Sequence, residues 1–326
     1  MPTKTTRREL LASAAAVPLA ATLPATLSRA ADKSSSEDFA GIVDAHVHIW
    51  TDDTKNFPLS DGFTADDMWF PSYSAEEVMQ LGSVAGVDRF NLIQMTWYGT
   101  DHQYILDVIA RYPKQFVGTG MVPAVTDISL ADPGAAMIDL SQGGVYAFRQ
   151  RGKSGRPKFN DGDRWMDHPG YEKMFATGAE HNLALSYLMT PADLPELDRM
   201  CSRFPETPVI IDHFCAIGRQ NMFIEEEIQQ LCAMARHRRV MLKIGAFYAL
   251  GAKKPPYLDM LPLIRRVVDA FGPERCMWES DSPLHTKNEH TFSAAVDIIK
   301  KHADFLSESD KHQILVKTAE DFFFNR

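Results

Sequence analysis

Three short apolar segments of the chain each end in side chains that bind metal ions or move protons. These ends are His46-Val47-His48, Asp212-His213 and Ser280-Asp281. Residues i and i+2 of a strand point to the same face, so the two imidazoles of the first motif reach one point. A further imidazole and a carboxylate from the other two segments could converge there. Such a set of nitrogen and oxygen donors suits Zn²⁺ or a similar divalent cation.

An eightfold alternation of strands and helices is expected to position these motifs. We predict strands at 41–46, 89–94, 116–122, 145–149, 183–188, 209–213, 240–244 and 276–279. We predict helices at 75–85, 101–112, 130–141, 169–181, 192–204, 223–237, 257–271, 290–304 and 308–323. This pattern predicts an α/β fold of the (β/α)8 TIM-barrel type, a single domain over 41–326, with catalytic residues at the C-terminal ends of strands. A doubly wound sheet is disfavoured because no G-x-G-x-x-G follows the first strand.

The N-terminus has the layout of an export signal. Arg7-Arg8 precedes an uncharged, Ala-rich run over 12–27, and Ser28-Arg29-Ala30 is a small-x-small cleavage site. We interpret 1–30 as a signal peptide of the twin-arginine type and 31–40 as a linker. The alternative is a membrane anchor, which two prolines and the short length of the run disfavour. The mature protein is expected to be periplasmic or secreted, with no membrane association after cleavage.

Composition narrows the class of protein. The 326 residues are 45% hydrophobic and 24% charged, which excludes a mainly disordered chain. A net charge of −9 argues against a nucleic-acid partner, so a small-molecule substrate is expected, and a homo-oligomer stays compatible with the sequence. Four widely spaced cysteines exclude a disulfide scaffold; free buried thiols are favoured, and one disulfide is the alternative. They are Cys201, Cys215, Cys232 and Cys276.

Three motifs carry a resemblance to a known family. They are D-A-H-V-H-I-W at 44–50, V-I-I-D-H at 209–213 and M-W-E-S-D-S-P at 277–283. Together they resemble the amidohydrolase superfamily, and within it the amidohydrolase-related (amidohydrolase 2) branch, which holds lactonases and non-oxidative decarboxylases. The resemblance covers about residues 41–326.

The resemblance implies roles for five residues. His46 and His48 match a metal-binding pair, and His213 matches a histidine near the attacking water or the substrate. Asp281 matches the general base, which also serves as a metal ligand. Arg149 resembles an arginine that binds a substrate carboxylate or carbonyl in the lactonases.

One departure from the family pattern concerns the metal. Metal-dependent members carry a histidine at the end of strand five, whereas this chain reads L-A-L-S-Y-L-M-T over 183–190. The lactonase subgroup is the better match, since some of its members lack that histidine and work without metal. The resemblance therefore implies either no cofactor or one divalent cation, Zn or Mn, held by His46, His48 and Asp281.

The function expected is that of an exported hydrolase that opens a lactone with a water activated by Asp281. The alternatives are a metal-dependent hydrolase or non-oxidative decarboxylase of the same branch, and a non-catalytic binding barrel. Arg151, Tyr187 and Trp50 are further candidates for substrate binding, each with packing or a loop role as the alternative. Lys243, at the end of strand seven, either faces the mouth of the barrel or forms an ion pair.

Overall fold

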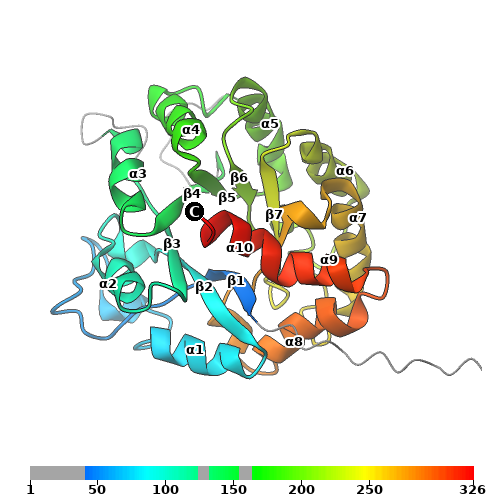
Figure 1. Ribbon diagram of the computed structural model, residues 1–326, viewed down its shortest axis with the longest axis horizontal. Helices are drawn as coiled ribbons and strands as arrows, with labels where there is room; N and C mark the ends of the chain where they lie inside the picture. Colours follow the sequence, from blue (N-terminus) through cyan, green and yellow to red (C-terminus); the bar gives the residue numbers. More distant parts are fainter. Residues whose placement is uncertain (1–40, 124–131, 154–163) are drawn as a thin grey trace, which may run out of the picture. The chain divides into compact units, whose positions relative to one another are not determined.

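Eight parallel strands run side by side in chain order in the computed structural model, which describes residues 41–123, 132–153 and 164–326 (Figure 1). They are β1 Ile42–Val47, β2 Val87–Ile93, β3 Phe116–Gly120, β4 Val145–Arg151, β5 Ala184–Leu188, β6 Val209–Ile211, β7 Val240–Ile244 and β8 Cys276–Trp278. The segments after β1 and β8 nearly close the ring, because His48 N–H donates to Ser282 O and Asp281 N–H donates to His46 O. The predicted single-domain (β/α)8 TIM barrel is confirmed. The expected signal peptide and linker lie outside the described residues.

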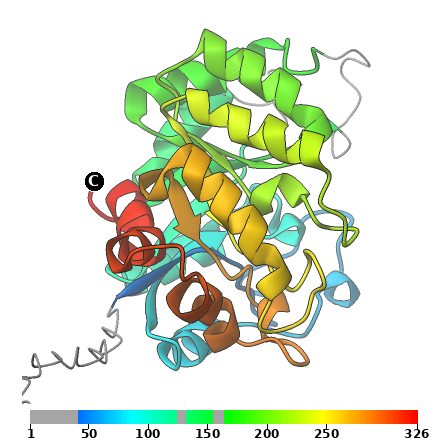
Figure 2. The same ribbon diagram turned by 90° about the vertical axis from the view of Figure 1, so that its right-hand side faces the viewer.

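Helices lie between the strands and around the ring (Figures 1 and 2). They are α1 Ala75–Ser83, α2 Gln103–Arg111, α3 Pro133–Ser141, α4 Pro169–His181, α5 Leu194–Arg203, α6 Glu225–Ala233, α7 Leu261–Phe271, α8 Phe292–Asp297, α9 Glu308–His312 and α10 Thr318–Phe323. A capping box starts α1: Glu77 N–H donates to Ser74 Oγ, and Ser74 N–H donates to the Glu77 carboxylate. Among the described residues, no helix is long and apolar enough to cross a membrane.

The C-terminal helix α10 closes the N-terminal end of the barrel. Phe322 and Phe323 pack against inward-facing apolar side chains from six of the strands. These are Val43, Ala45, Val117, Ala147, Ala184, Ile210 and Met277. In Figure 1, α10 lies in front of the centre of the ring. Because this end is filled with apolar side chains, the polar residues are left at the opposite, C-terminal end of the strands.

The structure corrects three details of the sequence prediction. The sixth strand ends at Ile211 and the eighth at Trp278, so His213 and Asp281 stand in the segments that follow the strands. The single helix expected over 308–323 is divided by a wider π turn at Gln313–Lys317. All four cysteines are free thiols, so the alternative of a disulfide is wrong.

Candidate active site

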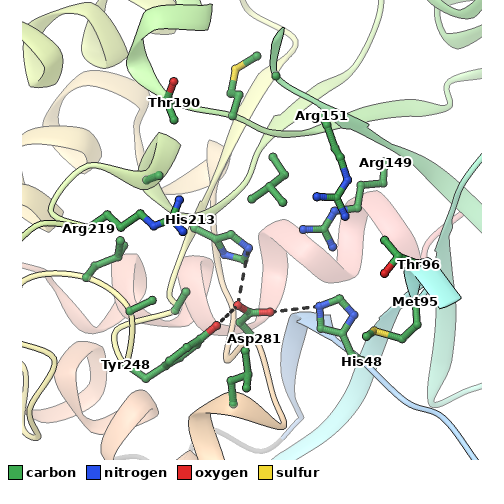
Figure 3. Close-up of a pocket in the computed structure, with 18 of the residues that line it drawn as sticks. His48, Met95, Thr96, Arg149, Arg151, Thr190, His213, Arg219, Tyr248 and Asp281 are labelled. Atoms are coloured by element: carbon green, nitrogen blue, oxygen red, sulfur yellow. Dashed lines mark hydrogen bonds and ion pairs between the residues drawn. The ribbon is translucent and has the colours of Figure 1, made fainter. Parts of the chain in front are cut away.

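A cavity of about 500 Å³ lies over the C-terminal ends of the strands (Figure 3). Its walls come from the ends of β2, β4 and β5 and from the segments after β1, β6, β7 and β8. The polar and charged side chains that line it are His48, Gln94, Thr96, Arg149, Arg151, Thr190, His213, Arg219, Tyr248 and Asp281. The structure therefore brings His48 and Asp281, which are 233 positions apart in the chain, into one pocket.

Asp281 contacts four other side chains at the floor of the pocket. Its Oδ1 lies 3.3 Å from His48 Nε2 and 3.5 Å from His46 Nε2. Its Oδ2 accepts a 2.6 Å hydrogen bond from the hydroxyl of Tyr248 and lies 3.8 Å from His213 Nε2. Burial acts to raise the pKa of Asp281, but the nearby positive charge of His213 outweighs it and holds the pKa well below its ordinary value. The carboxylate is therefore ionised at neutral pH.

His213 carries the complementary positive charge. Its Nδ1–H donates a 2.6 Å hydrogen bond to Glu279, a fully buried residue directly after β8. Burial acts to lower the pKa of His213, yet the negative charges of Glu279 and Asp281 outweigh it and raise the pKa to about 9. At neutral pH this residue is an imidazolium with one N–H directed toward Asp281.

The backbone that presents His213 is strained. Four consecutive residues, His213 to Ala216, have φ between 50° and 60°, the left-handed region that non-glycine residues seldom occupy. Asp281 has φ 59°. Each such residue costs on the order of 1 kcal/mol and persists only where the surrounding structure holds it in place. Both the acidic and the basic partner of the pocket are thus held in strained positions, which is common at functional sites.

The two histidines of the first motif differ in burial and in role. His48 Nδ1 donates to the carbonyl of Ile93 at 3.2 Å, which leaves the Nε2 lone pair toward the pocket. Burial lowers the pKa of His48 to about 4, so this ring is neutral. His46 is fully buried beneath the pocket, where its Nδ1 lies 3.1 Å from Lys243 Nζ and 3.3 Å from Glu279 Oε2.

The donor atoms of this pocket fit one small divalent ion. His46 Nε2, His48 Nε2 and Asp281 Oδ1 form a triangle with sides of 3.3, 3.5 and 3.3 Å. Tetrahedral ligands about 2.1 Å from a zinc ion stand roughly 3.4 Å apart, which matches this triangle. One ring nitrogen of His213 also lies within 4.8 Å of donor atoms of His46 and Asp281. The guanidinium of Arg149 approaches to 3.4 Å from His46 Nε2, and it competes for the lone pair of that nitrogen when the ring proton is on Nδ1.

Arginines give the pocket a positive wall. Arg149 forms no ion pair with a carboxylate in the described parts of the chain, and its Nε is buried without a hydrogen-bond partner. Burial and the neighbouring charge of Arg149 lower the pKa of Arg151. In Figure 3, Arg149 and Arg151 lie together on one side of His213, and Arg219 lies on the other. This wall favours an anionic ligand.

Two candidates for substrate binding do not line the pocket. Trp50 is fully buried, donates from its indole nitrogen to Phe70 O at 2.8 Å and stacks on that ring. Tyr187 is also fully buried, with its hydroxyl 3.7 Å from Met166 Sδ. The neighbour Ser186 points into the barrel, where it donates to Asp212, so Tyr187 points outward by strand alternation. The expectation for these two side chains is corrected to packing.

Several residues of the site were missed from the sequence. Trp69 and Tyr248 stand in loops, and their position depends on the path of the chain after β1 and β7. Arg219 follows the left-handed turn after β6. Glu279 belongs to the motif that contains Asp281. Its position two residues before Asp281 was the only signal in the sequence that pointed to it.

Comparison with known proteins places the chain in a family. Residues 43–324 match the amidohydrolase family. The chain belongs to the amidohydrolase family. The expected hydrolase activity is confirmed at this general level, because the curated relatives are named as hydrolases or as a lactonase.

Two relatives and one solved structure illustrate the similarity. The chain is 28% identical to the L-fucono-1,5-lactonase of Burkholderia ambifaria over 74% of this chain and 80% of that one. It is 28% identical to the 2-pyrone-4,6-dicarbaxylate hydrolase of Comamonas testosteroni over 77% and 79% of the two chains. An amidohydrolase from Burkholderia multivorans, solved with zinc bound, has a TM-score of 0.68 at 16% identity, over 87% and 99% of the chains. That structural likeness shows the fold.

Proposed function

We propose that this protein hydrolyses a lactone, the cyclic ester of a sugar acid or of a similar carboxylate. The observation that carries the proposal is the pairing of an ionised Asp281 with a protonated His213, 3.8 Å apart at the floor of the cavity. Hydrolysis of an ester needs both a proton acceptor for water and a proton donor for the leaving oxygen. The names of the two relatives support a cyclic ester as the substrate.

In this mechanism a water molecule attacks the lactone carbonyl and gives its proton to Asp281. The guanidinium of Arg149 stabilises the negative charge that develops on the carbonyl oxygen. The bond between the carbonyl carbon and the ring oxygen then breaks, and His213 gives its proton to the leaving oxygen. The product is a hydroxy acid, whose carboxyl group releases one proton to the solvent at neutral pH. Transfer of the proton from Asp281 to His213, 3.8 Å away, restores both groups.

The same pocket is compatible with a bound metal ion. His46, His48 and Asp281 are the residues that would hold a divalent ion of zinc or manganese. When bound there, the ion supplies Lewis-acid polarisation of the carbonyl. The alternative of a metal-dependent decarboxylase is distinguished by its product, because decarboxylation releases carbon dioxide and consumes a proton. The alternative of a metal-dependent hydrolase is distinguished by the loss of its activity in chelator.

A panel of lactones with a pH-indicator readout tests the proposal. The panel contains neutral sugar lactones and lactones that carry a carboxylate, each assayed with chelator and with added Zn²⁺ or Mn²⁺. We expect proton release with at least one lactone, and none with the Asp281→Asn variant, which keeps the fold. The absence of proton release from every lactone under all metal conditions contradicts the proposal.

Export is a separate proposal that rests on the N-terminal sequence. We infer that the mature chain begins near Ala31 and reaches the periplasm or the medium folded. Replacing Arg7 and Arg8 with Lys should stop export, whereas Lys4→Arg should not, because only the first change alters the paired arginines. Intact-mass measurement of the exported protein checks the cleavage site, and a mass that still includes Met1 contradicts the inference.

A further inference from the structure

Lys243 is a lysine without any access to solvent. It stands on β7 between apolar neighbours, and its side chain points into the barrel beneath the pocket. Its Nζ lies 2.9 Å from Asp212 Oδ1 and 3.1 Å from His46 Nδ1. A buried ammonium is costly unless it is paired and hydrogen-bonded, so these two contacts define what holds it.

The same neighbours form a second group of metal-type donors. One nitrogen of His46 and one oxygen each from Asp212 and Glu279 lie within 4.8 Å of one another, all of them buried. Asp212 Oδ2 and Glu279 Oε2 are buried and accept no hydrogen bond of standard geometry from the described residues, although His46 Nδ1 lies 3.3 Å from Glu279 Oε2. One imidazole and two carboxylates are a donor set that divalent cations accept. The ammonium of Lys243 already contacts two of the three members of this group, which we call the inner cluster.

We propose that Lys243 is a built-in cation that occupies the inner cluster in place of a divalent ion. The chain is thereby limited to a single exchangeable ion, at the outer triangle of His46, His48 and Asp281. The proposal concerns the selection of cations by the barrel and does not depend on which substrate the enzyme hydrolyses.

Lys243 also acts on the outer triangle through His46. An ammonium group only donates hydrogen bonds, so its bond to Nδ1 needs the lone pair of that nitrogen. The ring proton of His46 then lies on Nε2, directed at Asp281, 3.5 Å away. A nitrogen that carries a proton cannot bind a metal. Lys243 therefore weakens the outer site as well, because an ion there requires His46 to move its proton to Nδ1, toward Glu279.

The competing arrangement is that Nδ1 of His46 donates to Glu279, Nε2 accepts from Arg149 at 3.4 Å, and Lys243 pairs with Asp212 alone. In that arrangement Lys243 only neutralises a buried carboxylate, and its removal changes stability without any change in metal binding. The two arrangements thus differ in an observable that needs no substrate.

The test compares metal binding in the full-length wild type and in Lys243→Met, which keeps an unbranched side chain up to the ε position and removes the ammonium. Lys311→Met is the matched control, because Lys311 is also buried and paired, with Glu308 at 2.9 Å and Lys300 O at 3.2 Å. Each protein is stripped with chelator and titrated with Zn²⁺ and, for visible absorption, with Co²⁺. We expect Lys243→Met to bind one more ion per chain, or to bind the same ion about 10- to 100-fold more tightly. Changes of that size are typical when a residue that contacts a metal ligand is replaced.

Equal stoichiometry and affinity in the wild type, the control and Lys243→Met overturn the proposal. If Lys243→Met does not fold, Lys243→Gln is tested in the same way, and Zn²⁺ should raise its melting temperature more than that of the wild type. An equal effect of Zn²⁺ on both also overturns the proposal. Nitrogen NMR of the imidazoles gives an independent readout, since the proton of His46 should lie on Nε2 in the metal-free wild type. Failure of the lactone panel leaves all of these measurements unaffected.

Discussion

The hydroxyl of Tyr248 donates a 2.6 Å hydrogen bond to Oδ2 of Asp281 and fixes the orientation of that carboxylate. Tyr248 comes from the loop after β7, whereas Asp281 comes from the segment after β8. With Oδ2 held by Tyr248, Oδ1 stays on the side of the two histidines of the first motif. The candidate base therefore has one defined orientation in the pocket.

Tyr248→Phe should lower turnover by about 10- to 100-fold, because a hydrogen bond to a charged group is worth about 1.5–3 kcal/mol. The pKa of Asp281 should rise toward its ordinary value, since a donor to the ionised form is lost. Steady-state kinetics across acidic pH checks both effects. Tyr187→Phe is the control, because its hydroxyl lies outside the pocket and its removal should leave turnover near that of the wild type. Equal losses in both variants contradict a specific role for Tyr248.

Asp281→Asn should abolish most of the turnover while the protein stays folded. Asparagine tolerates the left-handed φ of 59° at this position, but it cannot accept a proton from water. General-base assistance is typically worth about 10²–10⁴-fold, and the loss should appear mainly in kcat. A thermal melt and a kinetic assay on the same sample separate catalysis from folding. Half of the wild-type kcat in a folded variant removes Asp281 from the mechanism.

The charge of His213 should make both stability and activity fall at alkaline pH. The pKa of this imidazole is about 9 in the folded protein, against 6.5 for the ordinary group. Because the folded pKa is raised, the stabilisation is fully present below about pH 6.5 and is lost as the pH rises through about 9. The proton donor for the leaving oxygen disappears over the same range. Denaturant melts and kcat/KM between pH 6 and 10 check this, and a flat profile up to pH 10 contradicts it.

Arg149→Met should lower kcat for every lactone, because the charge that stabilises the carbonyl oxygen is lost. It should also raise KM for a lactone that bears a carboxylate by about 10- to 100-fold, because a further charged hydrogen bond is lost. KM for a neutral lactone should change less, since no substrate anion is then left unpaired. Arg203→Met is the control: Arg203 is also an arginine, but it pairs with Glu172 outside the pocket. An equal change in KM for both kinds of lactone indicates that Arg149 acts on the carbonyl and not on a substrate anion.

Much of this site could be predicted from the sequence because the barrel repeats a simple rule. Parallel strands bring their C-terminal ends together, so motifs after three different strands meet at one mouth. His46, His48, His213 and Asp281 were identified by this rule, and in the structure both His46 and Asp281 contact the other two histidines, His48 and His213. The rule needs only the order of the strands, which apolar runs and turn residues predict well.

The loops were less predictable, since their path depends on packing. Trp50 follows the first motif directly, yet it turns into the core beneath Trp69, which takes the place at the pocket wall. Tyr187 lies on a strand close to the mouth, yet the parity of β5 points its ring outward. Choosing between these aromatic side chains requires the register of the sheet and the folded course of the excursion over 49–73.

The sequence by itself determined the barrel, the family and the set of donor groups, because these depend on local periodicity and on the order of motifs along the chain. Only the tertiary structure decided which charges meet. Glu279 and Asp281 raise the pKa of His213, while Lys243 faces His46 from a strand almost 200 residues away. Coulomb interactions and desolvation depend on distance and burial in three dimensions, and neither quantity is written in the spacing of residues along one chain.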